Sequence, residues 1–162
     1  MMHNSFIPVN DPYYPTPNEV VLHKLDLLAL KDGETVFDLG CGDAIQLIMA
    51  CTKANVQCIG YEIFPEAIKD AKINIQKADL SNQIEIREED IYKADISNAN
   101  ALILYFSRSV LGALSLKLEK ELPVGARIVT HQFDIPGWTE ELKKEVMQKN
   151  GALETIYLYR KI

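Results

Sequence analysis

The sequence predicts a doubly wound, Rossmann-like α/β fold, with a mostly parallel sheet that carries helices on both faces. Short apolar runs alternate along the chain with longer segments of helical periodicity, which is the pattern of repeated βαβ units. One of these runs, residues 101–106, is apolar throughout, as expected for a strand buried on both faces. The 162 residues contain no linker, repeat or low-complexity tract, so we expect a single domain over residues 1–162.

The first helix is expected to begin with a capping box. Thr16 can cap the helix, Glu19 can reach back from three residues later, and Pro17 suits the first helical position. The first helix is expected to end at residues 31–33, Lys-Asp-Gly, where Gly33 can terminate it. Residues 1–17 are polar, proline-rich and aromatic, which predicts an ordered arm ahead of this helix.

The remaining elements follow from the same two periodicities. Strands are expected at residues 35–39, 56–62, 84–87, 101–106 and 126–133, and helices at residues 44–54, from residue 65 onward, and at residues 110–122. The tail allows two interpretations, because residues 139–147 have helical composition while residues 149–151 suit a hairpin turn into residues 155–159. We expect a final antiparallel strand pair at the edge of the sheet.

Composition narrows the class of protein. Hydrophobic residues make up 48% of the chain and charged residues 25%, as in ordinary globular proteins. No apolar run is long enough to span a bilayer and no secretory signal is present, so we expect a cytoplasmic protein without a membrane partner. The net charge of −6 argues against nucleic acid as a partner. The three cysteines lack metal-ligand spacing, so we expect reduced thiols and no metal site.

The most informative segment is residues 36–43, Val-Phe-Asp-Leu-Gly-Cys-Gly-Asp. An apolar run carries Asp38 near its end, turns over Gly40 and Gly42, and enters a helical pattern, while the next apolar run ends in Glu62. Such a unit places glycines where backbone must approach a ligand and an acid where it can accept hydrogen bonds from ribose hydroxyls. The sequence therefore predicts a nucleoside cofactor.

Two common nucleotide motifs are disfavoured in this loop. The dinucleotide fingerprint requires a third glycine where this chain has Ile45, and no Gly-Lys-Ser/Thr sequence follows to make a phosphate loop. The remaining pattern, D-x-G-x-G with an acid ending the second strand, resembles motif I of the class I S-adenosylmethionine methyltransferases. The resemblance implies that the two glycines admit the methionine part of the cofactor, that Glu62 binds both ribose hydroxyls, and that Asp38 is also a cofactor-binding residue. It also implies that Asp90, after the third strand, meets the adenine amine.

A narrower resemblance covers nearly the whole chain. Residues 11–17, Asp-Pro-Tyr-Tyr-Pro-Thr-Pro, resemble the P-Y-x-P-T-P arm of the small archaeal protein-lysine methyltransferases and their mitochondrial relatives. The resemblance continues through residues 37–43, 117–122, 129–135 with Trp138, and 156–159. It implies that Tyr13 and Thr16 help to close over S-adenosylmethionine, and that the substrate is a protein presenting lysine.

The glycine loop departs from this subgroup at two positions. The subgroup usually reads G-D-G-R, whereas this chain has Ala44 and Ile45 after Gly42-Asp43. A left-handed backbone at Ala44 would cost ~1–2 kcal/mol, or roughly tenfold in affinity, whereas a right-handed one would cost nothing. The sequence leaves both open. A degenerate domain that binds cofactor weakly, or serves as a partner subunit, is therefore an alternative to an active enzyme.

Methyl transfer to lysine sets modest demands on the protein. The acceptor amine and the methyl group must lie in line about 3–3.5 Å apart, and the amine must be neutral, which an apolar or aromatic channel favours by desolvation. Tyr105, at the carboxyl end of the fourth strand, is the candidate channel residue, while Phe106 and His131 are expected to support the core.

Methylation of RNA or of a small molecule on the same fold is the second enzymatic reading. The N-P-P-Y signature of base methylation is absent after the fourth strand, where residues 104–107 read Leu-Tyr-Phe-Ser.

Overall fold

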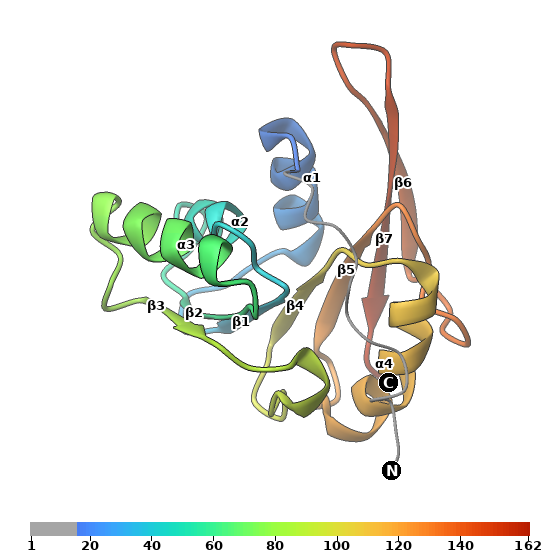
Figure 1. Cartoon of the computed structure of the whole chain (residues 1–162). Coiled ribbons are helices and arrows are strands. Elements are labelled where there is room, and N and C mark those ends of the chain that lie inside the picture. Colours follow the sequence, from blue (N-terminus) through green and yellow to red (C-terminus); the bar gives the residue numbers. More distant parts are fainter. Residues whose placement is uncertain (1–15) are drawn as a thin grey trace.

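The computed structural model describes residues 16–162, so Tyr13 and the rest of residues 1–15 lie outside the described residues. A seven-stranded sheet forms the centre of the molecule, with strand order β3-β2-β1-β4-β5-β7-β6 (Figure 1). The strands are β1 (Thr35–Leu39), β2 (Gln57–Tyr61), β3 (Ile84–Arg87), β4 (Ala101–Leu104), β5 (Arg127–His131), β6 (Leu142–Met147) and β7 (Leu153–Arg160). The helices are α1 (Asn18–Leu28), α2 (Ile45–Ala50), α3 (Pro65–Lys77), the 3₁₀ turn η2 (Ile91–Lys93) and α4 (Arg108–Glu121).

Strand direction follows the expectation from sequence. Strands β1 to β5 are parallel to one another, and β7 pairs antiparallel with both β5 and β6. This confirms the doubly wound α/β class and the antiparallel C-terminal pair. The β6–β7 hairpin extends well beyond the rest of the sheet (Figure 1).

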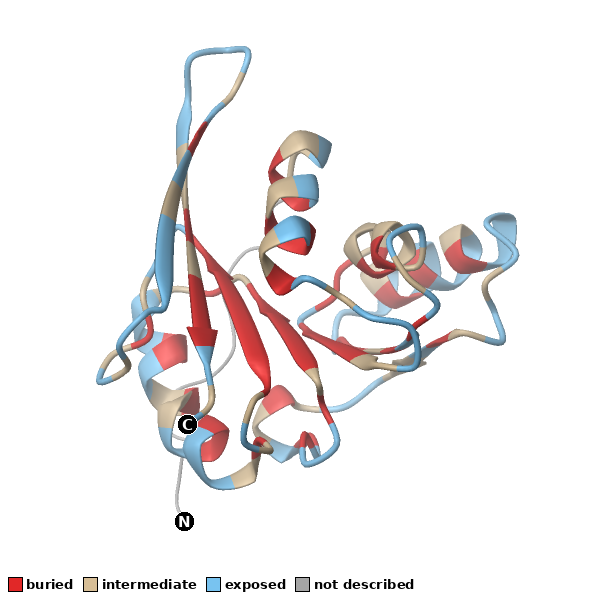
Figure 2. Ribbon diagram, turned by 180° about the vertical axis from the view of Figure 1, so that it is seen from behind, coloured by how far each residue is buried: buried red, intermediate tan, exposed pale blue. Residues whose placement is uncertain are grey.

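Two apolar layers hold the helices to the sheet. Helices α1, α2 and α3 cover one face, while η2 and α4 cover the other (Figure 1). The central strands β4 and β5 are buried along their whole length (Figure 2). Successive residues of β1 therefore serve different layers: Val36 packs with the α1 side and Phe37 with the α4 side.

The first helix differs from its sequence-based prediction. Pro17 is the N-cap, no side chain caps the helix, and the capping box expected from Thr16 and Glu19 is therefore wrong. The Thr16 hydroxyl instead accepts a hydrogen bond from the Gln46 amide at 3.2 Å, a tertiary contact that competes with local capping. The helix also ends before Gly33, because Ala29 adopts the left-handed conformation, with φ 50°, that terminates a helix.

Candidate functional site

The loop after β1 approaches the end of β2 through backbone hydrogen bonds. The N–H groups of Gly40 and Cys41 both donate to the Tyr61 carbonyl, at 2.7 and 3.0 Å. Gly40 has φ 77°, and a Cβ atom there would lie 2.7 Å from Cζ of Phe106, which is itself buried. The position therefore requires glycine twice over, for its conformation and for its space. Phe106 belongs to the core, as expected.

Ala44 resolves the question that the sequence left open. Its φ of 69° and ψ of 11° are left-handed, and its side chain is fully buried. Alanine in this conformation costs ~1–2 kcal/mol. Neighbouring groups hold the turn in place: the Asp43 side chain accepts from the Ile45 N–H at 3.2 Å, and the Asn74 amide donates to the Asp43 carbonyl at 3.0 Å. The loop keeps the shape of a glycine turn and stores strain at Ala44.

Glu62 joins the two loops at the carboxyl ends of β1 and β2. One carboxylate oxygen accepts a hydrogen bond from the Gly42 N–H at 2.8 Å, and the other accepts from the N–H groups of Ile63 and Phe64 at 3.0 and 3.2 Å. The side chain is only 5% exposed. A carboxylate has about four acceptor positions, so three backbone donors leave one for a ligand.

A second group of polar side chains lies on the face that α1 covers. Alternation along the strands points Asp38, Tyr105 and His131 toward this face, and the register of β7 on β5 adds Glu154 at the same edge. We call the following residues the polar cluster, of which Lys24, Asp38 and His131 are buried and the others half-buried: Lys24, Asp38, Gln46, Tyr105, His131 and Glu154. It lies at the carboxyl ends of the parallel strands, where ligands of such sheets bind.

Lys24 links the members of this cluster. It projects from α1, is fully buried, and donates to Gln46 Oε1 at 3.2 Å. Its ammonium lies 5.4 Å from the centre of the Tyr105 ring, a cation–π distance. The Tyr105 ring in turn packs on His131, with ring centres 4.1 Å apart.

Burial governs the protonation of the cluster. It raises the pKa of Asp38, against the opposing effect of Lys24, and lowers the pKa of Lys24, against the effects of Asp38 and Glu154. Burial, with a smaller contribution from Lys24, lowers the pKa of His131 to about 3, so this imidazole is neutral at physiological pH. His131 Nε2 lies 3.3 Å from a Glu154 carboxylate oxygen without the alignment of a hydrogen bond. Asp38 Oδ2 is buried and has no hydrogen-bond partner among the described residues.

The structure brings most of the sequence-predicted residues to this edge of the sheet. Thr16 reaches the cluster through Gln46. Asp90 follows β3 and caps η2, since its carboxylate accepts from the Tyr92 N–H at 2.9 Å; its contact with adenine stays a prediction.

The sequence did not lead us to predict Lys24 or Gln46 as residues of this site. The signal for Lys24 was its position on the apolar stripe of α1, spaced between Val21 and Leu28, where a lysine is out of place.

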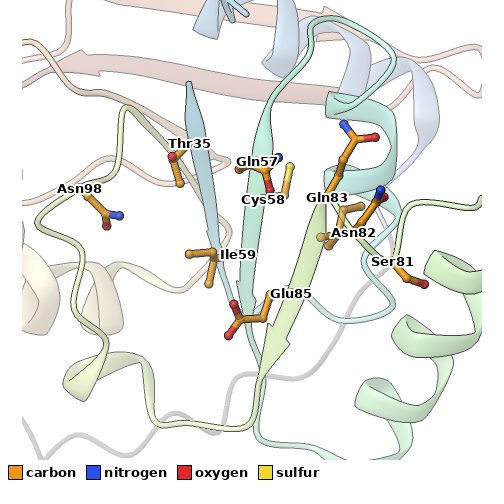
Figure 3. A pocket seen from close by; sticks show the side chains of 10 residues that line it. Thr35, Gln57, Cys58, Ile59, Ser81, Asn82, Gln83, Glu85 and Asn98 are labelled. Carbon is orange, nitrogen blue, oxygen red and sulfur yellow. The ribbon is translucent and has the colours of Figure 1, made fainter. Parts of the chain in front are cut away.

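An open pocket of about 560 Å³ lies elsewhere (Figure 3). It is at the amino ends of the strands, since Thr35, Gln57 and Ile84 begin β1, β2 and β3. Its other lining residues are Cys58, Ile59, Ser81, Asn82, Gln83, Glu85 and Asn98. Ligands of parallel sheets bind at the opposite edge, so we do not regard this pocket as the functional site.

Within residues 16–162, no helix is both long and apolar enough to cross a membrane. In the same part of the chain, no group of three or more His, Cys, Asp or Glu side chains is placed to hold a metal ion.

Comparison with known proteins identifies relatives over the whole fold. Residues 38–142 match the ANTKMT methyltransferase domain. A protein-lysine N-methyltransferase of Saccharolobus islandicus (strain REY15A) is 36% identical over 157 residues, which are 96% of each chain. The adenine nucleotide translocase lysine N-methyltransferase of Mus musculus is 31% identical over 78% of this chain, and this chain spans 55% of its length. The crystal structure of an RNA methyltransferase from Salinibacter ruber with S-adenosyl-L-homocysteine has a TM-score of 0.82 and 32% identity, over 91% of this chain and 93% of that one.

Proposed function

The chain belongs to the ANTKMT methyltransferase domain family, and from this premise we propose that it is an S-adenosylmethionine-dependent protein-lysine N-methyltransferase. The observation that carries the proposal is the archaeal relative, a protein-lysine N-methyltransferase that matches this chain at 36% identity over 96% of both proteins. The cofactor loop and the acid at the end of β2 support the same reading. The target is a protein that presents a lysine side chain.

The residues of the glycine loop fit the cofactor. Gly40 offers backbone where a Cβ atom would collide with Phe106, and Gly42 is held open by its hydrogen bond to Glu62. Asp38 presents a buried carboxylate oxygen that has no hydrogen-bond partner within residues 16–162, as a site for an ammonium group would. When bound, the cofactor would supply a methyl group on a sulfonium centre, whose neutral thioether is a good leaving group. Glu62 would hold the ribose, and it would exchange a backbone hydrogen bond to accept both hydroxyls.

The acceptor lysine needs a dry, preorganised approach. We infer that Tyr105 lines it, because this ring follows β4 at the carboxyl edge and is packed on the neutral imidazole of His131. Desolvation against such a surface favours a neutral amine over an ammonium. No general base is required in the transfer step, since an amine that enters without its proton is already a nucleophile. The substrate ammonium gives up its proton to water before attack, and the methylated product is an ammonium that keeps its proton in neutral water. Positioning accounts for the rate.

RNA methylation is the second candidate function. It is favoured by the Salinibacter ruber neighbour, an RNA methyltransferase that is 32% identical to this chain. The net charge of −6 opposes it, because proteins that bind RNA usually carry a basic patch or stripe. We therefore rank protein lysine first.

A transfer assay distinguishes the two. Purified protein is incubated with methyl-labelled S-adenosylmethionine and either a mixture of proteins or total RNA. We expect label in protein and none in RNA, and we expect Glu62→Gln to abolish most of it, because the amide has only one acceptor oxygen for groups that bind a carboxylate. Label that is sensitive to ribonuclease and insensitive to protease would reverse the ranking.

A further inference from the structure

Lys24 is a buried cation with no obvious structural purpose. Its side chain is fully buried on the apolar face of α1, beside Val21 and Leu25. Lysine is almost never fully buried unless it is paired, because desolvating an ammonium is costly. An apolar residue at this position would complete the stripe that packs α1 on the sheet. The cost of burying Lys24 therefore points to a use.

The ammonium retains unused hydrogen-bonding capacity. It has three donors, and among the described residues its hydrogen-bond acceptor is Gln46 Oε1 alone. The face of the Tyr105 ring lies 5.4 Å away. Asp38 on β1 and Glu154 on β7 act on Lys24 through their charge, and the His131 imidazole on β5 is neutral. Within residues 16–162, the other two N–H donors of the Lys24 ammonium have no hydrogen-bond acceptor.

Asp38 has the complementary deficit. Its Oδ2 atom is buried and makes no hydrogen bond to any residue of the described range, and its carboxylate is close enough to Lys24 for each to shift the other's pKa. A cation with spare donors beside a carboxyl group with a spare acceptor is the complement of a zwitterion, and an ammonium bound there favours the ionised carboxylate over the protonated form that burial alone favours. The amino-acid end of S-adenosylmethionine, with one ammonium and one carboxylate on the same carbon, is such a group.

The glycine loop itself contains no cation that could take the carboxylate. Residues 35–52 include neither lysine nor arginine. A ligand seated on this loop must find its positive partner on another element. Helix α1 packs on α2 and β5, and Lys24 is the lysine that it sends into the site.

We propose that Lys24 binds the α-carboxylate of the cofactor's amino-acid moiety, opposite Asp38, which receives the α-ammonium. The inference rests on the proposed function, since it concerns how the same cofactor is held. Lys24 is thus a cofactor-binding residue contributed by α1, outside the glycine loop. The four charges alternate in sign, so bound cofactor compensates the burial of both side chains.

The test compares ligands that differ only at this end. Calorimetry measures the Kd of S-adenosylmethionine, of its decarboxylated analogue, which keeps the amine, and of 5′-methylthioadenosine, which lacks both groups. Lys24→Met should weaken S-adenosylmethionine about 10- to 100-fold, the value of a hydrogen bond to a charged group, and leave the other two within about threefold. Asp38→Asn should weaken S-adenosylmethionine and the decarboxylated analogue together, and leave methylthioadenosine unchanged.

Controls separate a binding role from a structural one. Lys120→Met removes an exposed lysine on α4 and the same formal charge, and should change none of the three Kd values. If Lys24→Met does not fold, as judged by thermal unfolding, Lys24→Gln serves in its place. Equal weakening of all three ligands by Lys24→Met, or no weakening of any, would overturn the inference and leave the proposed function standing. Failure of the wild-type protein to bind S-adenosylmethionine would overturn both.

Discussion

Replacing Gly40 by alanine tests the central geometry of the glycine loop. The added Cβ would lie 2.7 Å from Cζ and 3.2 Å from Cε1 of Phe106, at a backbone φ of 77°. The left-handed conformation costs ~1–2 kcal/mol for alanine. Overpacking against a buried ring costs about 1–3 kcal/mol more, and the stiffer unfolded chain returns about 0.4–1 kcal/mol. We expect a loss of about 1–5 kcal/mol, centred near 3 kcal/mol.

Gly125→Ala is the matched control. Its φ is 92°, and a Cβ atom there would meet nothing within 4 Å, so this variant carries the conformational cost without the collision. Urea denaturation measures both: with a slope of about 1–3 kcal/mol per molar, the midpoint of Gly40→Ala should fall by roughly 1 M further than that of Gly125→Ala.

A double-mutant cycle identifies the ring as the cause. Phe106→Leu removes the ring atoms that the new methyl group meets, so it should relieve Gly40→Ala by at least about 1 kcal/mol, as contacting pairs do. If Gly40→Ala unfolds no more easily than Gly125→Ala, or if Phe106→Leu gives no relief, the close approach of the loop to Phe106 is refuted.

Three other predictions follow from the same structure. Glu34→Gln should destabilise by about 1.5–3 kcal/mol at pH 7, because the amide keeps only one acceptor for the two 2.7 Å bonds from Arg127 and carries no charge. Arg127 lowers the pKa of Glu34, so the difference from wild type should persist above pH ~4.3 and vanish as the pH falls through the lowered value, which acid titration of unfolding measures. Burial lowers the pKa of His131 to about 3, so the unfolded chain takes up a proton at a higher pH than the folded protein does. As the pH is lowered from ~6.5 to about 3, the free energy of unfolding should fall by up to ~1.4 kcal/mol per pH unit. His131→Phe should flatten this slope, and an unchanged slope in the variant would contradict the assignment to His131. Ala44→Gly should change the free energy of unfolding by less than about 1 kcal/mol relative to wild type, because relief of the left-handed strain offsets the lost contacts of the buried methyl group and the greater freedom of the unfolded chain. Ala44→Val should cost more than ~2 kcal/mol at the same left-handed position, and thermal melts measure both variants.

The strands and the cofactor loop were predictable because their signals are local. Alternating and continuous apolar runs located β1 to β5 and β7 within a few residues, and Pro65 marked the start of α3. Strand β6 had no such signal, because residues 139–147 have helical composition. The cofactor loop was predictable from Gly40, Gly42 and Glu62, because their conformations and hydrogen bonds arise within one βαβ unit. The sequence also showed that alanine replaces the usual glycine at position 44. It did not show whether the backbone there is left-handed or right-handed, since alanine adopts either conformation when the surrounding structure requires it.

The polar cluster was not predictable, because it is assembled from distant segments. Thr16 had a plausible local partner in its own capping box and used Gln46 instead, which no reading of residues 16–19 could reveal. Lys24 meets the site only when α1 packs across the ends of β5 and β7. Burial, and not residue type, sets the protonation of Asp38 and His131, so their chemistry appears only in the folded protein.

Mass spectrometry of the methylated product tests the central claim most directly. A mixture of proteins is incubated with S-adenosylmethionine and either wild-type protein or Glu62→Gln, digested, and searched for peptides that gain methyl groups. We predict added methyl groups on lysine side chains with the wild-type protein, and their loss with the variant. Tight S-adenosylmethionine binding without any methylated lysine, or methyl groups recovered on RNA instead, would contradict the assignment as a protein-lysine methyltransferase.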